Sequence, residues 1–220
     1  MSIVLFLLAA IVSYLLGSVS FAVIFTRHFI RRDVRDIGSG NAGMTNVMRS
    51  AGLLPGLLTF LFDALKASAA CLIGKYLIFG TLAEMAGIET PLAIYGALFC
   101  GIFCQIGHIF PLFFQFRGGK AVACTAGIFA VCNWKVLVIC LSAFLIVFLL
   151  TRIISASSIT AMVVGPVVEY CTIAPEYRLI ATLLTSAIAL IVIIKHKDNI
   201  VRLIKGEEKK LVIKKDKENE

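Results

Sequence analysis

The amino-acid sequence predicts an all-α, polytopic membrane protein with seven transmembrane helices. Hydrophobic residues make up 60% of its 220 residues and charged residues only 15%, and its mean hydropathy is +0.96. Apolar runs such as residues 3–25 and 179–194 have or approach the length needed to cross a bilayer. A soluble domain of this size carries far more charge, so this composition excludes the soluble classes.

The individual spans are defined by where apolar runs meet turn residues and charges. The first run lacks a preceding basic segment and is longer than the apolar part of a signal peptide, so we expect it to remain in the protein. The stretch "VCNWK" divides the long run 120–151 into two spans, the first of which is short for a crossing. The predicted spans are residues 3–26, 53–79, 91–114, 120–132, 135–151, 154–172 and 178–195.

The distribution of basic residues predicts the orientation. With the N-terminus outside, 17 of the 21 Lys and Arg residues fall in the inner segments. Short loops rich in Lys and Arg stay in the cytoplasm, so we expect an outer N-terminus and a cytoplasmic C-terminus. Merging the fourth and fifth spans would put Arg152 and the basic tail on opposite sides, which favours seven spans.

The chain is expected to form one transmembrane domain over residues 1–220, with a flexible charged tail from about residue 209. There is no linker and no clear internal repeat. Cys100 and Cys104 lie one helical turn apart, but no nearby His or carboxylate completes a metal site. We therefore predict no metal site and interpret the seven cysteines as small apolar packing residues.

The first polar stretch, "DIGSGNAGMTNVMRSAG", covers residues 36–52. Its backbone N–H groups and its amide and hydroxyl side chains are suited to holding oxyanions. Arg49 can bind a phosphate through two hydrogen bonds. The alternative is a helix start capped by Ser39 or Asn41, but capping requires only one such residue and five are present. The candidate site residues are Gly38, Ser39, Gly40, Asn41, Thr45, Asn46 and Arg49.

The second polar stretch, "GHIFPLFFQFRGGKAVA", covers residues 107–123. Gly118 and Gly119 allow backbone N–H groups to converge on an anion, with the ammonium of Lys120 beside them. It is not a Walker loop, because Ala121 stands where that pattern needs Ser or Thr. An ordinary turn before a helix is the alternative. His108, Gly118 and Gly119 are candidate binding residues, and Lys120 is a candidate catalytic residue.

The third polar stretch, "KHKDNIVRLIKGEE", covers residues 195–208, where the last span leaves the membrane. His196, Asn199 and Arg202 would share one face if the helix continues past the membrane. A histidine at a membrane edge is often only interfacial. Together with the two other stretches suited to binding anions, however, this face indicates a cytoplasmic pocket for phosphorylated substrates. Glu208 is a further candidate binding residue.

The second span contains two ionisable residues in the stretch "FDALK". Charged side chains at membrane depth are costly, so they pair with one another or line a functional cavity. The i, i+3 spacing of Asp63 and Lys66 places both on one helix face. A structural ion pair and direct substrate binding both remain open.

These motifs resemble those of the bacterial membrane glycerol-3-phosphate acyltransferases that use acyl phosphate as donor, the PlsY family. The family motif GSGNxGATNxxR corresponds to "GSGNAGMTNVMR" at residues 38–49, and GHxFPxFxxFxGGKxVAT corresponds to "GHIFPLFFQFRGGKAVAC" at residues 107–124. HxxNIxRLxxGxE corresponds to "HKDNIVRLIKGEE" at residues 196–208. Met44, Cys124 and Ala67 (in the FDxxKG motif) depart from the family pattern.

The resemblance implies transfer of a fatty acyl group from acyl phosphate to the 1-hydroxyl of sn-glycerol 3-phosphate, giving lysophosphatidic acid and phosphate. It implies no cofactor, and as partners the two substrates and the lipid bilayer, with no nucleic acid. A monomer in the bacterial inner membrane is expected, with its active site on the cytoplasmic face. Candidate catalytic residues are Ser39, Arg49, Lys120, His196 and Asn199.

The general base has two candidates, His196 and the phosphate oxygen of the donor. Two other functions compete with acyl transfer. A transporter of an organic phosphate would also place basic residues near the membrane, but the sequence shows no repeat of the kind many transporters have. A structural or lipid-binding membrane protein would not require three such polar stretches.

Overall fold

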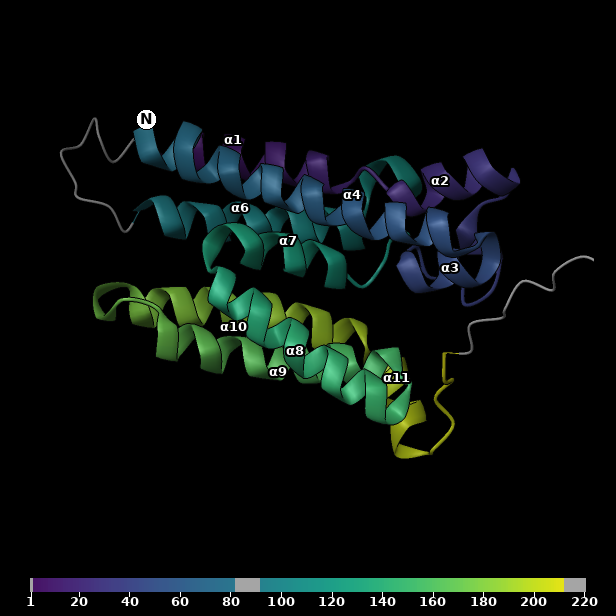
Figure 1. Ribbon diagram of the computed structural model, residues 1–220. Coiled ribbons are helices and arrows are strands. Elements are labelled where there is room, and N and C mark those ends of the chain that lie inside the picture. The colour runs from purple at the N-terminus through teal and green to yellow at the C-terminus, as the bar shows by residue number, and fades with distance from the viewer. Residues whose placement is uncertain (1, 82–91, 212–220) are drawn as a thin grey trace, which may run out of the picture.

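The computed structural model describes residues 2–81 and 92–211, and its regular structure within these ranges is entirely helical (Figure 1). The helices are α1 Ser2–Gly17, α2 Phe21–Ile30, α3 Met44–Ala51, α4 Leu53–Leu72, α6 Leu92–Ile109, α7 Val122–Cys132, α8 Trp134–Thr151, α9 Ile154–Thr172, α10 Arg178–Lys195 and α11 Lys197–Ile204. A π-helical turn, η2 Ile73–Ile78, continues α4, and short 3-10 turns form η1 Val34–Asp36, η3 Leu112–Phe114 and η4 Pro175–Tyr177. Residue 91 of the predicted third span and most of the predicted flexible tail lie outside the described residues.

Six helical stretches of the described chain have the length and hydropathy of membrane spans. They are Ile3–Ile30, Leu53–Thr81, Ala93–Phe114, Trp134–Thr151, Ile154–Thr172 and Pro175–Lys195. The predicted fourth span contains only α7, whose 11 residues extend about 16 Å at about 1.5 Å per residue. A bilayer core is roughly 30 Å thick, so this segment is as short for a crossing as predicted, and the count of seven transmembrane helices stays a prediction.

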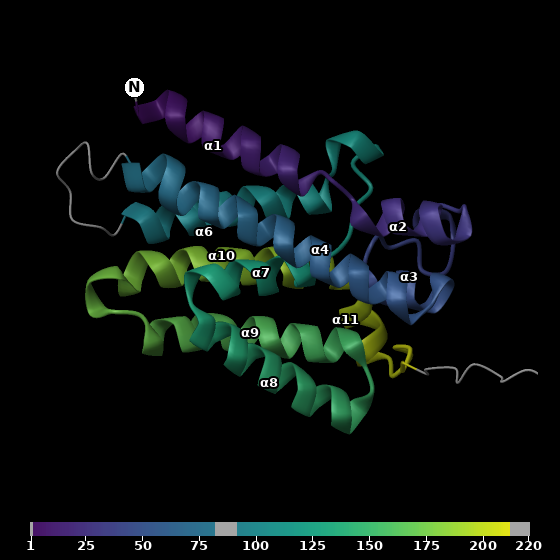
Figure 2. The same ribbon diagram turned by 45° about the horizontal axis from the view of Figure 1, so that its top comes forward.

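Helix α7 can be short because protein surrounds it. It packs against α4, α6, α8 and α10, and Figure 2 shows it beside α6 and α10 in the middle of the bundle. The turn after α7 is satisfied by Asn133, which accepts a hydrogen bond from the Lys135 amide at 3.2 Å and donates to Glu169 at 2.9 Å. Irregular backbone at membrane depth is tolerated where protein satisfies its polar groups. The break predicted at "VCNWK" is therefore confirmed.

The predicted first span is also interrupted, between α1 and α2. The Ser18 hydroxyl donates to the Tyr14 carbonyl at 2.9 Å and accepts from the Leu112 amide at 3.2 Å. The Val19 carbonyl accepts a hydrogen bond from Lys66 of α4 at 2.6 Å. The Lys66 side chain thus satisfies a backbone carbonyl left free at this break, and the Leu112 amide ties the break to the second loop.

The interior of the bundle is built from small residues. A Cβ atom on Gly17 of α1 would meet the Cys104 carbonyl of α6, and one on Gly107 of α6 would meet the Tyr14 carbonyl of α1. These glycines let the two helices approach closely, as small residues do in membrane proteins. The predicted packing role holds for the five buried cysteines, Cys71, Cys100, Cys104, Cys124 and Cys140.

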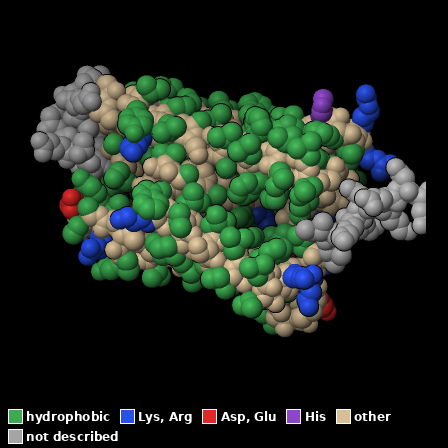
Figure 3. Space-filling model, viewed as in Figure 1, with side chains coloured by type: hydrophobic (Ala, Val, Ile, Leu, Met, Phe, Trp, Pro, Cys, Tyr) green, Lys and Arg blue, Asp and Glu red, His purple; other side chains and the backbone are tan. Residues whose placement is uncertain are grey.

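The two ends of the bundle differ. The N-terminus lies at one end, and α2, α3 and α11 lie at the other (Figures 1 and 2). Hydrophobic side chains cover the flank, whereas most Lys, Arg, Asp and Glu side chains visible from this side lie toward the ends, and one basic side chain lies inside a hollow (Figure 3). The opposite placement of the N-terminus and α11 agrees with the predicted arrangement. Which end faces the cytoplasm stays a prediction.

Candidate functional site

Three polar segments meet at the end of the bundle that carries α2, α3 and α11. They are the first loop (residues 37–43), the second loop (residues 110–121) and the C-terminal segment (residues 196–208). The Ala42 carbonyl of the first loop lies 2.5 Å from where a Cβ atom on Gly119 would stand. Lys120 donates a hydrogen bond to Asn199 of the C-terminal segment. The structure therefore brings together all three stretches that the sequence singled out.

Asn46 of α3 organises the first loop. Its side-chain amide donates to the carbonyls of Val34 and Ile37, both at 3.0 Å, and its side-chain oxygen accepts from the Ser39 amide at 3.0 Å. Gly38 has a φ of 61°, in the left-handed region that favours glycine, and a Cβ atom there would meet the Asn46 oxygen. Asn46 is thus a structural residue of this loop, and its predicted substrate contact stays a prediction.

The capping alternative for the first loop is wrong. The N-cap of α3 is Gly43, and no side chain makes a capping hydrogen bond to this helix. Ser39 is exposed, and Asn41 and Thr45 are half-buried. Because these side chains do not cap α3, they are available to a ligand.

The glycines of the second loop are required by close backbone contacts. A Cβ atom on Gly118 would meet the His108 carbonyl, and one on Gly119 would meet the His108 imidazole as well as the Ala42 carbonyl. The Gly119 amide donates to the His108 carbonyl at 3.2 Å. The second loop is therefore clamped between the end of α6 and the first loop. Whether this loop binds an anion or is only a turn before α7 stays open.

Lys120 and Glu208 are the centres of a partly buried polar network. The Lys120 ammonium donates to the Asn199 side-chain oxygen, and the Asn199 amide donates to Glu208 at 2.6 Å. Glu208 also accepts from Arg202 at 2.6 Å and from the Ser155 hydroxyl of α9 at 2.8 Å. Asn199 is only 6% exposed. This network joins the second loop, α9, α11 and the chain beyond α11.

The network holds two opposite charges in a partly dry environment. Burial lowers the pKa of Lys120, while the nearby Glu208 carboxylate raises it, and the balance lies below the ordinary lysine value. Burial would raise the pKa of Glu208, but hydrogen bonds from Asn199, Arg202 and Ser155 outweigh it and hold that pKa below its ordinary value. Near neutral pH the carboxylate is ionised and offsets the cationic side chains around it.

His196 stands between α10 and α11, so the helix does not continue unbroken through this face as predicted. The break does not separate the face, because Asn199 and Arg202 still converge on Glu208. His196 Nδ1 lies 2.8 Å from the Val192 carbonyl, which only accepts, so Nδ1 carries the proton and Nε2 is left as an acceptor. Burial lowers the pKa of His196 to about 4, although the Val192 hydrogen bond opposes this shift.

Asp63 and Lys66 form an ion pair at 2.7 Å, and each side chain is only 2% exposed. His108 Nδ1 lies 3.1 Å from the Lys66 ammonium and 3.5 Å from the Asp63 carboxylate. The predicted pairing is confirmed, and it links α4 to the end of α6 that supports the second loop. Direct substrate binding by Asp63, Lys66 and His108 stays a prediction.

Two findings concern residues at the margin of this site. Arg49 lies on an exposed face of α3, and its predicted phosphate contact stays a prediction. Ser155 was missed by sequence reasoning, although the serine-rich start of α9, "ISASSIT", is an unusual composition for a membrane span and was a usable signal. Within residues 2–81 and 92–211, no group of three His, Cys, Asp or Glu side chains is arranged as a metal site.

Comparison with known proteins gives consistent matches. The chain matches the sequence profile of the family described as glycerol-3-phosphate acyltransferase over residues 7–206. It is 36% identical over 216 residues to a glycerol-3-phosphate acyltransferase of Clostridioides difficile (strain 630), covering 98% of this chain and 100% of the relative. It is 38% identical over 203 residues to a protein of the same description from Idiomarina loihiensis, covering 92% of this chain and 94% of the relative.

Two solved structures are similar throughout. The first is a crystal structure of PlsY (YgiH), an integral membrane glycerol 3-phosphate acyltransferase, in its glycerol 3-phosphate form. It is 31% identical, with a TM-score of 0.80 over 94% of this chain and 96% of that one. The second, the lysophosphatidic acid form, is 30% identical with a TM-score of 0.78 over 94% and 95% of the two chains.

Proposed function

Because this chain belongs to the glycerol-3-phosphate acyltransferase family, we propose that it acylates the 1-hydroxyl of sn-glycerol 3-phosphate with acyl phosphate as the donor. The products are lysophosphatidic acid and inorganic phosphate, in the first acylation of phospholipid synthesis. The crystal structures similar to this chain are of a protein in a glycerol 3-phosphate form and a lysophosphatidic acid form, which supports this acceptor and product.

The observation that carries the proposal is the partly buried network around Lys120. The ammonium lies beside the glycine-rich second loop and is anchored by Asn199, while Glu208 holds Asn199 and Arg202 in place. Preorganised cations and backbone N–H groups in a partly dry pocket stabilise charge that develops on phosphate or carbonyl oxygens. We therefore propose that this part of the protein binds two phosphorylated substrates.

An acyl phosphate is already activated, so no acyl-enzyme intermediate is needed. The 1-hydroxyl oxygen attacks the carbonyl carbon of the donor, and the bond from that carbon to the phosphate oxygen breaks. The hydroxyl proton leaves with the phosphate, and Lys120 neutralises the negative charge of the carbonyl oxygen and of the departing phosphate. Ser39 on the exposed first loop is placed to bind a phosphate oxygen.

We propose that the end carrying α2, α3 and α11 faces the cytoplasm and that the protein works as a monomer in the bacterial inner membrane. The basic residues of α2, of the segment between α2 and the first loop, of α3 and of α11 support this orientation, because positively charged short segments stay inside. The net charge of +8 would also attract both anionic substrates.

The deciding experiment is turnover by the purified protein with sn-glycerol 3-phosphate and a panel of donors. We expect lysophosphatidic acid and phosphate from acyl phosphate, and little or no product from acyl-CoA or acyl carrier protein. The loops described at this end are too short to form a binding domain for the adenosine part of acyl-CoA. Comparable rates with acyl-CoA would refute the donor, and no acylation with any donor would refute the activity.

The Gly119→Ala variant tests the second loop. The added Cβ atom would meet the Ala42 carbonyl at 2.5 Å and press on the His108 imidazole, so the two loops must separate. We expect kcat/KM to fall roughly 10–100-fold, with the KM for glycerol 3-phosphate rising more than that for the donor. The control is Gly165→Ala on α9, where the nearest atoms lie at 3.3 Å or more. An unchanged KM in folded Gly119→Ala protein would assign this segment to an ordinary turn.

The His196→Gln variant separates the two candidate bases. With a pKa of about 4, His196 is neutral at pH 5.5 and above and is a weak base, so we expect it to position groups rather than take the proton. The variant should keep much of its rate and a similar pH profile between pH 5.5 and 8 under saturating substrates. A loss of roughly 10²–10⁴-fold, together with disappearance of a wild-type acidic limb, would instead identify His196 as the general base.

A further inference from the structure

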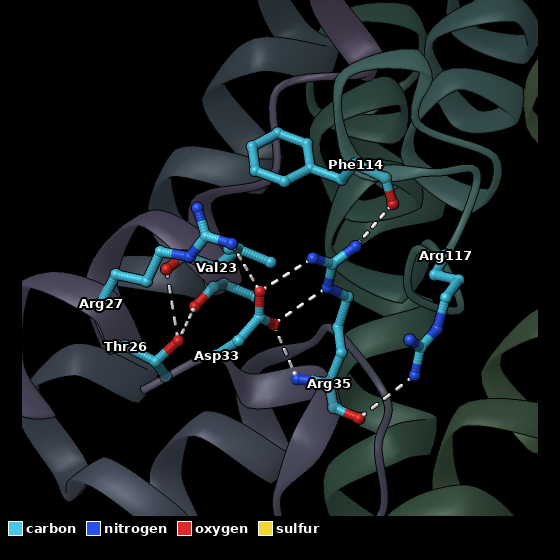
Figure 4. Close-up of polar contacts among 8 residues, drawn as sticks. Val23, Thr26, Arg27, Asp33, Arg35, Phe114 and Arg117 are labelled. Carbon is cyan, nitrogen blue, oxygen red and sulfur yellow. Dashed lines mark hydrogen bonds and ion pairs between the residues drawn. The ribbon is translucent and has the colours of Figure 1, made fainter. Parts of the chain in front are cut away.

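Asp33 and Arg35 form a two-point ion pair in η1, just before the first loop (Figure 4). One oxygen of Asp33 accepts from the Arg35 backbone amide at 3.0 Å and from its Nε at 2.9 Å, and the other accepts from Arg35 Nη2 at 2.8 Å. Arg27 of α2 donates to the same carboxylate at 2.9 Å. Two-point carboxylate–guanidinium pairs are directional and are among the strongest hydrogen-bonded pairs.

Arg35, just before the first loop, also connects this part of the chain to the second loop. Arg35 Nη1 donates to the Phe114 carbonyl at 2.5 Å, and Arg117 Nη2 donates to the Arg35 carbonyl at 3.4 Å, as Figure 4 shows. The Arg35 guanidinium also lies 5.8 Å from the centre of the Phe114 ring. Segments about 80 residues apart in the chain are thus joined by hydrogen bonds in both directions.

The position of the pair makes it stronger than an ordinary surface ion pair. The side chains of Arg35 and Asp33 are 9% and 10% exposed, whereas that of Arg27 is 58% exposed. Hydrogen bonds from Arg35 hold the pKa of Asp33 well below its ordinary value, so the pair is charged throughout the neutral range. Exposed pairs are weakened by solvent and side-chain freedom, and this one is largely protected from both.

The two loops touch at a second place closer to Lys120. Ala42 of the first loop is fully buried, and its carbonyl faces Gly119, the residue before Lys120. The Arg35 carbonyl in turn lies 3.3 Å from where a Cβ atom on Gly40 would stand. A shift of Arg35 would therefore be passed through the first loop to its contact with the second loop.

We propose, on the basis of the function proposed above, that Asp33 and Arg35 are positioning residues that hold the first loop against the second and set the spacing between Ser39 and Lys120. Neither residue belongs to the three family motifs, the first of which begins at residue 38. They act through the Phe114 carbonyl and the Arg35 backbone rather than by touching substrate. Lys120 is held by Asn199, so a shift of the first loop mainly moves Ser39, the proposed phosphate contact. Such a shift would weaken substrate binding more than it slows the chemical step.

The Arg35→Lys variant tests the pair while keeping its charge. A lysine ammonium cannot donate to both oxygens of Asp33 and to the Phe114 carbonyl in the fixed planar geometry of a guanidinium. We expect the KM for glycerol 3-phosphate to rise about 10-fold, with kcat within about 3-fold of wild type. Arg32→Lys is the matched control, since it makes the same change at an exposed arginine of the same segment. A wild-type KM in Arg35→Lys would overturn the proposal.

Measuring the Arg35→Lys change in a Ser39→Ala protein separates positioning of Ser39 from simple support of the fold. If Arg35 acts by placing Ser39, then in a Ser39→Ala protein the Arg35→Lys change should raise the KM less than about 3-fold further, because coupled residues are not additive. The same 10-fold rise in both backgrounds would show that Arg35 acts independently of Ser39.

Amide hydrogen exchange tests the pair without any turnover. We expect faster exchange in both the first and the second loop of Arg35→Lys than in Arg32→Lys, with the membrane helices unchanged. Equal exchange in the two variants would overturn the positioning role even if the protein acylated nothing. If the wild-type protein acylated nothing but the two loops still exchanged faster in Arg35→Lys than in Arg32→Lys, only the proposed function would be refuted.

Discussion

Replacing Lys120 by alanine is expected to lower kcat/KM by roughly 10²–10³-fold, the loss typical of removing one preorganised donor to developing charge. The ammonium is held by Asn199 within a network centred on Glu208, so its position is fixed before substrate arrives. Alanine would leave the departing phosphate without this charge and Asn199 without its donor. Measurement of kcat and KM for both substrates should show a loss in kcat as well as in binding.

The control for this variant is Lys197→Ala, which removes the same charge from an exposed position on α11. It should change the KM values little, because an exposed charge acts on substrate only through screened attraction. The pH dependence adds a second check. Because burial lowers the pKa of Lys120, wild-type kcat/KM should decline on the alkaline side below the ordinary lysine value of 10.5. A Lys120→Ala protein with near-normal kcat would refute the role assigned to this residue.

Replacing Asp63 by alanine is expected to destabilise the protein by about 3–5 kcal/mol, because it leaves the buried Lys66 ammonium without its counter-charge. Each side chain of the pair is 2% exposed, so water cannot replace the lost partner. For a chain of this length, such a loss corresponds to a decrease in unfolding temperature of roughly 6–20 °C. Thermal unfolding of the purified protein in detergent measures it directly.

The matched variant is the double replacement Asp63→Leu with Lys66→Met, which removes both charges together. It should be more stable than Asp63→Ala, because no uncompensated charge remains. It should not reach wild-type stability, since the Val19 carbonyl would lose the hydrogen bond from Lys66, at a cost of about 1–3 kcal/mol. If the double variant were as unstable as Asp63→Ala, the charge imbalance would not be the cause.

The sequence predicted the helical membrane class and the three polar segments because both depend on local composition. It also predicted that the run 120–132 is short for a crossing, which agrees with the 11 residues of α7, but it did not show whether that run ends inside the protein. Whether such a run crosses a bilayer or ends inside the protein depends on neighbours, here α4, α6, α8 and α10. The break between α1 and α2 was missed for a similar reason, because its free carbonyl is satisfied by Lys66 from a distant helix.

The sequence predicted which residues lie at the site better than it predicted what each residue does there. Polar residues at Ser39, Asn46 and Lys120 were found from their position between apolar runs, but the sequence could not show that Asn46 holds the first loop through three hydrogen bonds. Ser155 lies in α9, 53 residues before Glu208, which lies beyond the end of α11. Such a contact depends on how the helices pack, which no local pattern records.

The contacts of Gly118 and Gly119 have a consequence for the genetics of this protein. An added methyl group would meet the His108 carbonyl at Gly118, and at Gly119 it would meet the Ala42 carbonyl as well as the His108 imidazole. A side chain elsewhere can be shortened by a second mutation, but a carbonyl oxygen is present whatever residue occupies its position. Suppressors of a Gly118 or Gly119 substitution should therefore be rare among neighbouring side-chain changes. They should arise instead from changes that move a whole loop, such as insertions or deletions between α6 and α7.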